Sequence, residues 1–182
     1  MQSGEVLAGC VEQIFYLRFT GDVRLPWCVS LEDYCNHVLQ NKAVDSLLVD
    51  LSQSENLDST TLGILAKIGI AAKSKLGSVP SIYLDDAGIE RLLASMGFTA
   101  IFNVYRLPPP ALPQLPVLPI LDVVEDEMQD SVIDAHRALM QMNQRNSEQF
   151  ESLVETLEQS RDQARNHKHD HKHDHKQGNE TP

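Results

Sequence analysis

Hydrophobic positions in the first half of the chain fall into short runs and into helical periodicities. Two apolar patches, residues 6–8 and 14–17, lead to a glycine and predict two short strands. From Ser30 to Gln40 apolar residues recur every three or four positions, which predicts an amphipathic helix capped by Ser30. The continuous apolar run 46–51 then predicts a central strand that is covered on both faces.

The same alternation continues up to residue 106. Residues 59–76 form a broad apolar helical face that ends near Gly77. A strand over 80–84, a short helix over 87–96 and a last strand over 101–104 follow. The order ββαβαβαβ predicts right-handed crossovers and a mostly parallel sheet with packed helices, so the expected fold class is a small α/β sandwich.

A proline-rich stretch separates this region from the rest of the chain. Residues 107–119 repeat proline at positions that forbid a continuous helix and favour an extended spacer. Beyond it, apolar residues at four-three spacing resume after a phase slip, which predicts one long amphipathic helix or two. We therefore expect an α/β domain over 1–106, a Pro-rich linker over 107–121, a C-terminal helical extension over 122–165 and a disordered His-rich tail over 166–182. The helical stripe is Met128, Val132, Ala135, Leu139 and Met142, then Phe150, Leu153 and Leu157.

Charge and composition narrow the class of partner. The formal net charge of −11 disfavours nucleic-acid binding, because phosphate backbones would be repelled. Three cysteines without CxxC spacing predict reduced, mostly buried thiols. No apolar stretch approaches the length of a membrane span, and the N-terminus lacks a basic region followed by an apolar block. We expect a cytoplasmic protein that binds another protein or a small ion and no membrane.

The segment that carries candidate chemistry joins the central strand to the second long helix. It ends in Asp-Ser-Thr-Thr-Leu-Gly, residues 58–63, and so places a hydroxyl at a helix start. From the residues alone, Asp58 or Ser59 can simply cap the helix. His37 and His136 fall on separate predicted helices without a nucleophile or metal-protease motif, so we expect no enzyme and no required cofactor.

With these residues, the stretch 6–105 resembles the STAS family, and in particular the bacterial anti-sigma factor antagonists. The family motif, Asp-Ser-Ser-Gly-Leu-Gly after a strand and a short loop, reads here with Thr61 in place of its first glycine. The resemblance implies phosphorylation at Ser59. It also implies an anti-sigma factor that is itself a serine kinase, and an opposing metal-dependent serine phosphatase. The partner-binding residues it implies are Asp58, Ser59, Thr60, Thr61 and Gly63.

Physical chemistry gives this implied switch a mechanism. A phosphate at a helix N-terminus lies beside unpaired N–H groups and the positive end of the helix dipole, so the fold tolerates it. The modification adds about −1.5 to −2 charges, which a partner surface built for a neutral hydroxyl must desolvate. We expect unphosphorylated Ser59 to bind the partner and phosphorylated Ser59 to release it. The switch requires that the Ser59 hydroxyl is not deeply enclosed in the fold. We also expect Thr61, which is bulkier than the glycine of the family motif, to affect which partner binds.

Several alternatives remain open from the sequence. The chain could be a non-switching STAS subunit of a lipid or anion transport complex. The helical extension could pair with a second copy of the chain, dock on the α/β domain or contact the partner. The tail alternates histidine with lysine and aspartate, which favours either a solvated polar tail or weak nickel, zinc or copper binding. The candidate metal ligands are His167, His169, His171, His173 and His175.

Overall fold

The computed structural model describes residues 4–41 and 43–174, and its centre is a five-stranded sheet. The strands lie in the order of the sequence, β1-β2-β3-β4-β5. The first pair is antiparallel, and the other three pairs are parallel. The strands are β1 Glu5–Val11, β2 Ile14–Val23, β3 Ser46–Leu57, β4 Ser81–Leu84 and β5 Asn103–Arg106.

Helices connect the parallel strands and then extend the chain beyond the sheet. The connecting helices are α1 Cys28–Gln40, α2 Ser59–Lys75 and α3 Ala87–Ser95, with short 3-10 turns η1 Leu25–Trp27 and η2 Phe98–Ala100. The extension consists of α4 Glu125–Met142 and α5 Gln144–Asp174. The predicted α/β class, the mostly parallel sheet and the C-terminal helical extension are confirmed.

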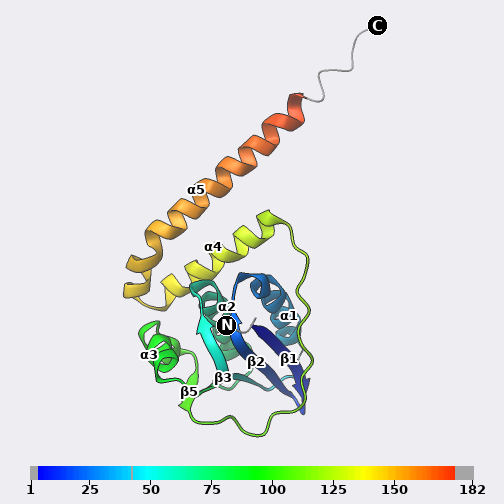
Figure 1. The fold of residues 1–182 in the computed structure, drawn as a ribbon, viewed down its shortest axis with the longest axis vertical. Coiled ribbons are helices and arrows are strands. Elements are labelled where there is room, and N and C mark those ends of the chain that lie inside the picture. The colour runs from blue at the N-terminus through cyan, green and yellow to red at the C-terminus, as the bar shows by residue number, and fades with distance from the viewer. Residues whose placement is uncertain (1–3, 42, 175–182) are drawn as a thin grey trace.

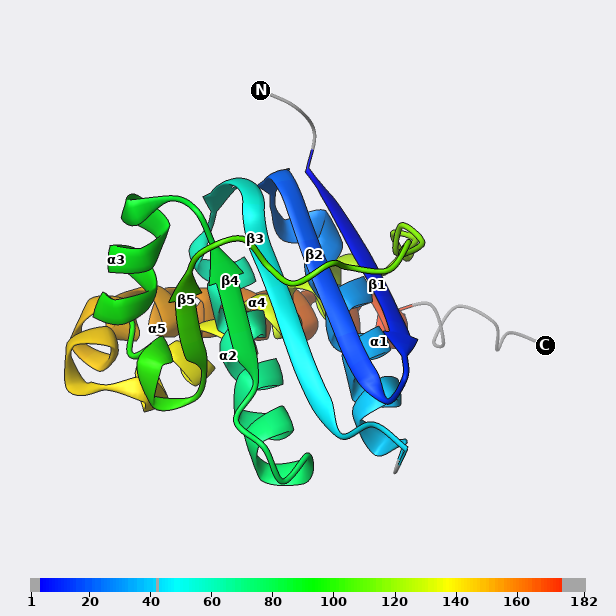
Figure 2. The same ribbon diagram turned by 90° about the horizontal axis from the view of Figure 1, so that it is seen from below.

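The elements form a stack of layers. Helices α1 and α2 cover one face of the sheet, α4 lies on these two helices, and α5 lies beyond α4 (Figure 1). The segment after β5 crosses the opposite face of the sheet (Figure 2). One hydrophobic core includes Phe15 and Val49 of the sheet, Leu65 of α2 and Leu139 of α4. Of the three alternatives for the extension, the structure shows docking on its own α/β domain.

Two local predictions need correction. Helix α1 begins at Cys28 after Trp27, so Ser30 is not its cap. Ser30 is buried and its hydroxyl accepts a hydrogen bond from the Leu121 N–H at 2.7 Å, which fixes the end of the linker. Strand β3 continues through the polar residues 52–56 to Leu57 because the end of β2 pairs with it as far as Val23 and Leu57. A polar sequence is tolerated there since this ladder supplies the backbone hydrogen bonds.

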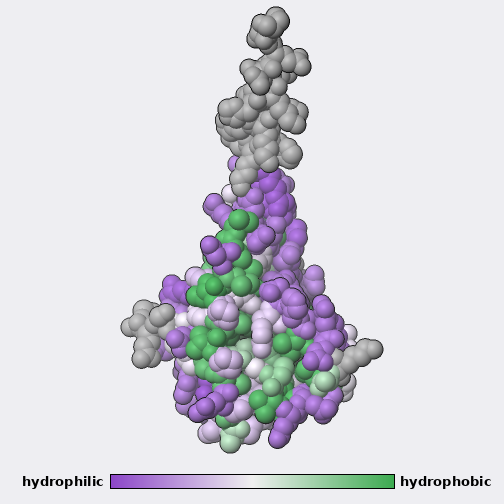
Figure 3. Space-filling model, turned by 90° about the vertical axis from the view of Figure 1, so that its right-hand side faces the viewer, coloured by the Kyte–Doolittle hydropathy of each residue, from purple (hydrophilic) through white to green (hydrophobic). Residues whose placement is uncertain are grey.

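The Pro-rich linker is extended, as predicted, and part of it is attached to the sheet. The N–H of Ala8 donates to the Pro116 carbonyl at 3.1 Å, and the N–H of Leu118 donates to the Val6 carbonyl at 2.8 Å. Hydrophobic residues lie exposed on the side of the molecule shown in Figure 3, and Val117, Ile120 and Leu121 of the linker are among the exposed large hydrophobic residues. The linker therefore covers the open edge of β1, where unpaired backbone groups would otherwise invite another strand.

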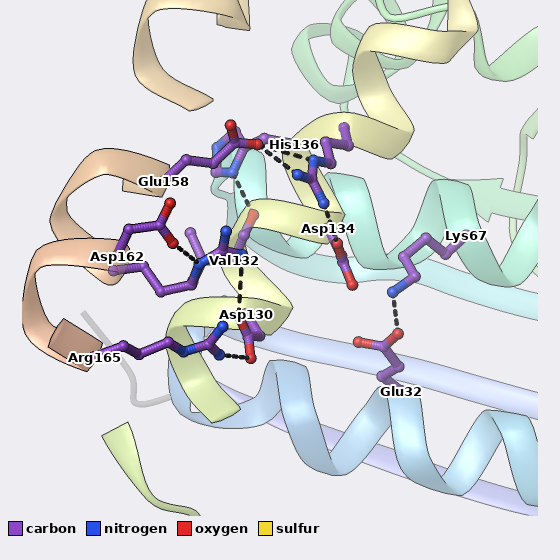
Figure 4. A network of polar contacts seen from close by, with 11 residues as sticks. Glu32, Lys67, Asp130, Val132, Asp134, His136, Glu158, Asp162 and Arg165 are labelled. Atoms are coloured by element: carbon purple, nitrogen blue, oxygen red, sulfur yellow. Dashed lines mark hydrogen bonds and ion pairs between the residues drawn. The ribbon is translucent and has the colours of Figure 1, made fainter. Parts of the chain in front are cut away.

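The predicted phase slip in the extension is a break between two helices at Asn143. The buried side chain of Asn146 donates to the carbonyls of Met96 and Leu139 at 3.0 and 2.9 Å, which ties the start of α5 to the end of α3. Exposed ion pairs join the two helices, including Arg165–Asp130 at 2.6 Å (Figure 4). Such pairs contribute about 0.2–1 kcal/mol each, so packing holds the extension.

The boundary of the predicted disordered tail also needs correction, because helix α5 runs on to Asp174. The sequence from residue 144 to 174 has no proline or glycine to end a helix that is already formed, and each further residue adds a backbone hydrogen bond. The tail histidines proposed as metal ligands lie outside the residues whose side chains the structure describes.

Candidate functional site

The candidate site begins where β3 turns into α2. Asp58 is the N-cap of α2 and its carboxylate accepts a hydrogen bond from the Thr61 N–H at 2.7 Å. Ser59 is therefore the first residue of the helix, next to N–H groups that have no partner within it. The sequence prediction of a hydroxyl at this helix start is confirmed, and the capping role of Asp58 accompanies it.

The hydroxyl of Ser59 is half-buried and contacts the helical extension. Its Oγ lies 2.9 Å from Nε2 of His136, a residue of α4 that is only 2% exposed. The other ring nitrogen, Nδ1, lies 2.8 Å from the Val132 carbonyl (Figure 4). Because a carbonyl only accepts, a neutral ring carries its proton on Nδ1, and the Ser59 O–H donates to Nε2. The hydroxyl is neither free nor deeply enclosed: one helix covers it.

The two threonines that follow Ser59 are buried. Thr61 is 1% exposed, and its hydroxyl donates to the Val23 carbonyl at 3.3 Å. Its Oγ1 also lies 3.9 Å from the Cys28 thiol. Thr60 is buried as well. The expectation that Thr61 adds bulk to the binding surface is therefore wrong, since its side chain packs inward and a hydroxyl at this position serves the fold.

Burial also decides the state of the thiol below this site. Burial raises the pKa of Cys28 to about 12, and the negative charge of Asp58 adds to the effect. Burial likewise raises the pKa of Cys35 well above its ordinary value. Both groups are thiols at neutral pH, so neither supplies a thiolate nucleophile near Ser59. The predicted reduced, buried state holds for these two cysteines, whereas Cys10 is exposed.

Gly63 lies one turn further along α2, directly beneath α4. A Cβ added to Gly63 would lie 2.7 Å from the Cβ of Ala135 and would overlap its carbonyl group. This contact requires glycine on α2 and a small residue on α4, because any side chain on Gly63 would push the helices apart. The structure thus brings Ser59 and Gly63 together on one surface, and α4 occupies that surface.

A second polar contact fixes α4 beside α1. Glu32 of α1 accepts hydrogen bonds from Lys67 of α2 and from the Ser131 hydroxyl of α4, the latter at 3.1 Å. The α1–α2 face is the surface that carries Ser59, Gly63, Glu32 and Lys67. It therefore offers a helix one carboxylate acceptor and one serine hydroxyl on either side of a close apolar contact.

A serine bonded to a histidine is also the first contact of Ser-His-Asp hydrolases, where a buried carboxylate orients the imidazole. Here the Val132 main-chain carbonyl takes that place, and His136 lies on the buried side of α4, where it is 2% exposed. Among the described residues no group of three or more His, Cys, Asp or Glu side chains could hold a metal ion. No helix within the described ranges has the length and apolarity to cross a membrane.

Sequence reasoning placed Ser59 and Gly63 but missed the role of His136. The four-three stripe put Ala135 on the apolar face of the extension and His136 directly beside it. A polar residue adjacent to a buried stripe signals a buried hydrogen bond, because burial without one is costly. The sequence could not reveal that the partner atom belongs to a helix that starts 77 residues earlier.

No protein-family model matches the chain, and a search of curated proteins gives no match. Among solved structures, the chain is similar to an anti-sigma factor antagonist from Mycobacterium paratuberculosis. That likeness has a TM-score of 0.49 and 21% sequence identity, and covers 58% of this chain and 87% of that one. The chain is also similar to the protein TM1081, with a TM-score of 0.48 and 19% identity, over 54% of this chain and 78% of that one. The observed element order ββαβαβαβ is the order expected from the sequence for a STAS-like domain, here followed by a C-terminal helical extension.

Proposed function

We propose that this chain is a cytoplasmic anti-sigma factor antagonist that acts by partner switching. In this proposal the unphosphorylated chain binds an anti-sigma factor that is also a serine kinase, and so frees a transcription factor. The kinase transfers the γ-phosphoryl group of a nucleoside triphosphate to Ser59 Oγ, and the hydroxyl loses its proton. A metal-dependent phosphatase reverses the modification by hydrolysis.

The observation that carries the proposal is the position of the Ser59 hydroxyl, at the first residue of α2 and on a surface that accepts a helix. The adjacent N–H groups and the helix dipole favour a phosphate there, so phosphorylation need not unfold the domain. The added charge of about −1.5 to −2 would act where the surface now meets a buried imidazole. Partner release then follows from local electrostatics and sterics.

The test is a comparison of four full-length chains expressed in the source cells. Wild type, Ser59→Ala, Ser59→Glu and Ser74→Ala are purified with phosphatase inhibitors, and their phosphopeptides and bound proteins are identified by mass spectrometry. Ser74 is an exposed hydroxyl near the other end of the same helix and serves as the matched control.

We expect phosphate on Ser59 of the wild type. We also expect a kinase-like partner bound to Ser59→Ala and recovered at least roughly tenfold less with Ser59→Glu, since glutamate imitates part of the charge. Ser74→Ala should behave as wild type. Equal recovery with all four chains, or a wild type that never carries phosphate on Ser59, would contradict the switch. The second result would favour the non-switching transport subunit.

A further inference from the structure

Helix α4 covers the surface on which the proposed partner would have to bind. It reaches Ser59 through His136 and Glu32 through Ser131, and it packs Ala135 against Gly63. These contacts lie within two turns of α4, between Ser131 and His136, and involve both α1 and α2. The side chains that α4 buries are Ser131, Ile133, Ala135, His136, Ala138 and Leu139.

The shape of this surface selects the kind of helix that can lie on it. The distance between two packed helices depends on the side chains at their contact. At Gly63 the α2 surface has no side chain, and the facing residue of α4 is alanine. A helix with a large residue at that point could not approach closely enough to reach Ser59 and Glu32 together. The surface therefore fits an amphipathic helix with a small residue between two polar ones.

We propose that α4 is an intramolecular substitute for a helix of the anti-sigma partner, and that the two helices compete for the α1–α2 face. This inference rests on the proposed function and names the chemistry of the partner. The partner helix presents a small residue to Gly63, a hydrogen-bonding side chain to Ser59 and a donor to Glu32. The chain is then capped when α4 is bound and active when α4 has left.

Phosphorylation and capping exclude each other in this geometry. With His136 Nε2 at 2.9 Å from Ser59 Oγ, the imidazole fills the space that a phosphoryl group would occupy. A kinase must also reach the hydroxyl, which α4 covers. The α1–α2 face therefore has three competing states: covered by α4, bound to the partner helix, or phosphorylated and free of both.

The test uses a fluorescent peptide with the sequence of residues 122–143 as the probe and full-length chains as receptors. In the wild type the chain's own α4 occupies the surface. Ala135→Arg places a long charged side chain against Gly63 and should displace α4 while leaving the α1–α2 face unchanged. Leu139→Glu, at a position of α4 that is fully buried, gives a second opened chain.

We expect both opened chains to bind the peptide at least roughly tenfold more tightly than the wild type, because their binding-competent fraction is larger. Adding Gly63→Leu to Ala135→Arg should abolish this binding. A peptide that itself carries Ala135→Arg should not bind to any chain. Hydrogen exchange of the β3 amides in each receptor verifies that the sheet is folded.

Opened chains with an intact sheet that bind no more peptide than the wild type would overturn the inference. Peptide binding that survives Gly63→Leu would also overturn it. The outcome is separable from the proposed function: peptide binding without phosphate on Ser59 in cells would remove the switch and keep the helix-binding surface. Phosphate on Ser59 without peptide binding would keep the switch and remove the helix-binding surface.

Discussion

Replacing Gly63 with alanine tests the contact between α2 and α4 with a single methyl group. The new Cβ would lie 2.7 Å from the Cβ of Ala135, whereas carbon atoms pack best at about 3.5–4.0 Å. Backbone atoms of Ala135 also lie in the way, so rotation of a side chain cannot relieve the overlap. We expect α4 to move outward by about 1 Å or to detach.

The cost follows from the contacts that such a shift would break. The Ser59–His136 distance would grow from 2.9 Å to about 3.9 Å, outside hydrogen-bonding range. Loss of this bond and of the Ser131–Glu32 bond would cost about 0.5–1.5 kcal/mol each. The docking of α4 should therefore weaken by about 2 kcal/mol, which corresponds to roughly 30-fold. Alanine also raises the helix propensity of α2 by about 1 kcal/mol, but α2 is helical whether or not α4 is bound.

Hydrogen exchange followed by mass spectrometry under native conditions measures this weaker docking of α4 directly. Amides of α4 should exchange roughly 30-fold faster in Gly63→Ala, while amides of β3 keep their protection. Gly69→Ala is the matched control, because the same change on the same helix meets the Phe102 ring and not α4. It should disturb the β5 edge of the sheet and leave α4 in place. Unchanged α4 exchange in Gly63→Ala, or equal loss across the sheet, would refute the reasoning.

Four further predictions follow, three from the described residues and one from the histidine-rich tail. At pH 8 a disulfide reagent should titrate only Cys10 in the folded chain and all three thiols in denaturant, because Cys28 and Cys35 are buried with raised pKa values; rapid reaction of two or more native thiols would contradict this. Since the pKa of Cys28 is about 12 in the folded chain and 9.0 without burial, stability should fall as pH rises from 9 towards 12, as a denaturant titration at each pH would show. Asp58→Ala should lower stability by about 1 kcal/mol through loss of the N-cap, whereas an unchanged melting temperature would argue that the cap adds nothing. Calorimetry with nickel or zinc should show weak binding that disappears when residues 166–182 are removed; identical heats for both chains would exclude the tail as a metal site.

The sequence predicted the elements that neighbouring residues determine. It failed where contacts with a distant segment determine the local structure. The apolar run 46–51 gave the centre of β3, but its polar continuation is a strand only because β2 pairs with it. The serine at position 30 looks like a helix cap, yet it binds the backbone of Leu121, 91 residues later. At the candidate site, the Asp58–Ser59 helix start was readable from neighbouring residues. The contact of Ser59 with His136 on α4 could not be predicted, because a single sequence does not show which helix faces pack together.

The attachment of the linker to β1 limits how far a released α4 can travel. Hydrogen bonds hold the chain at Pro116 and Leu118, and α4 begins at Glu125. The six residues between Leu118 and Glu125 span at most about 20 Å when fully extended, and the hydrogen bond of Leu121 to Ser30 shortens the free stretch further. While these hydrogen bonds persist, a detached α4 remains tethered close to the α1–α2 face. Its effective concentration at that face is then in the millimolar range, as is typical of short flexible linkers. An incoming partner must compete with the tethered α4 for the α1–α2 face. A longer linker lowers the effective concentration of α4, so the same partner should bind more tightly without any change at the contact surface.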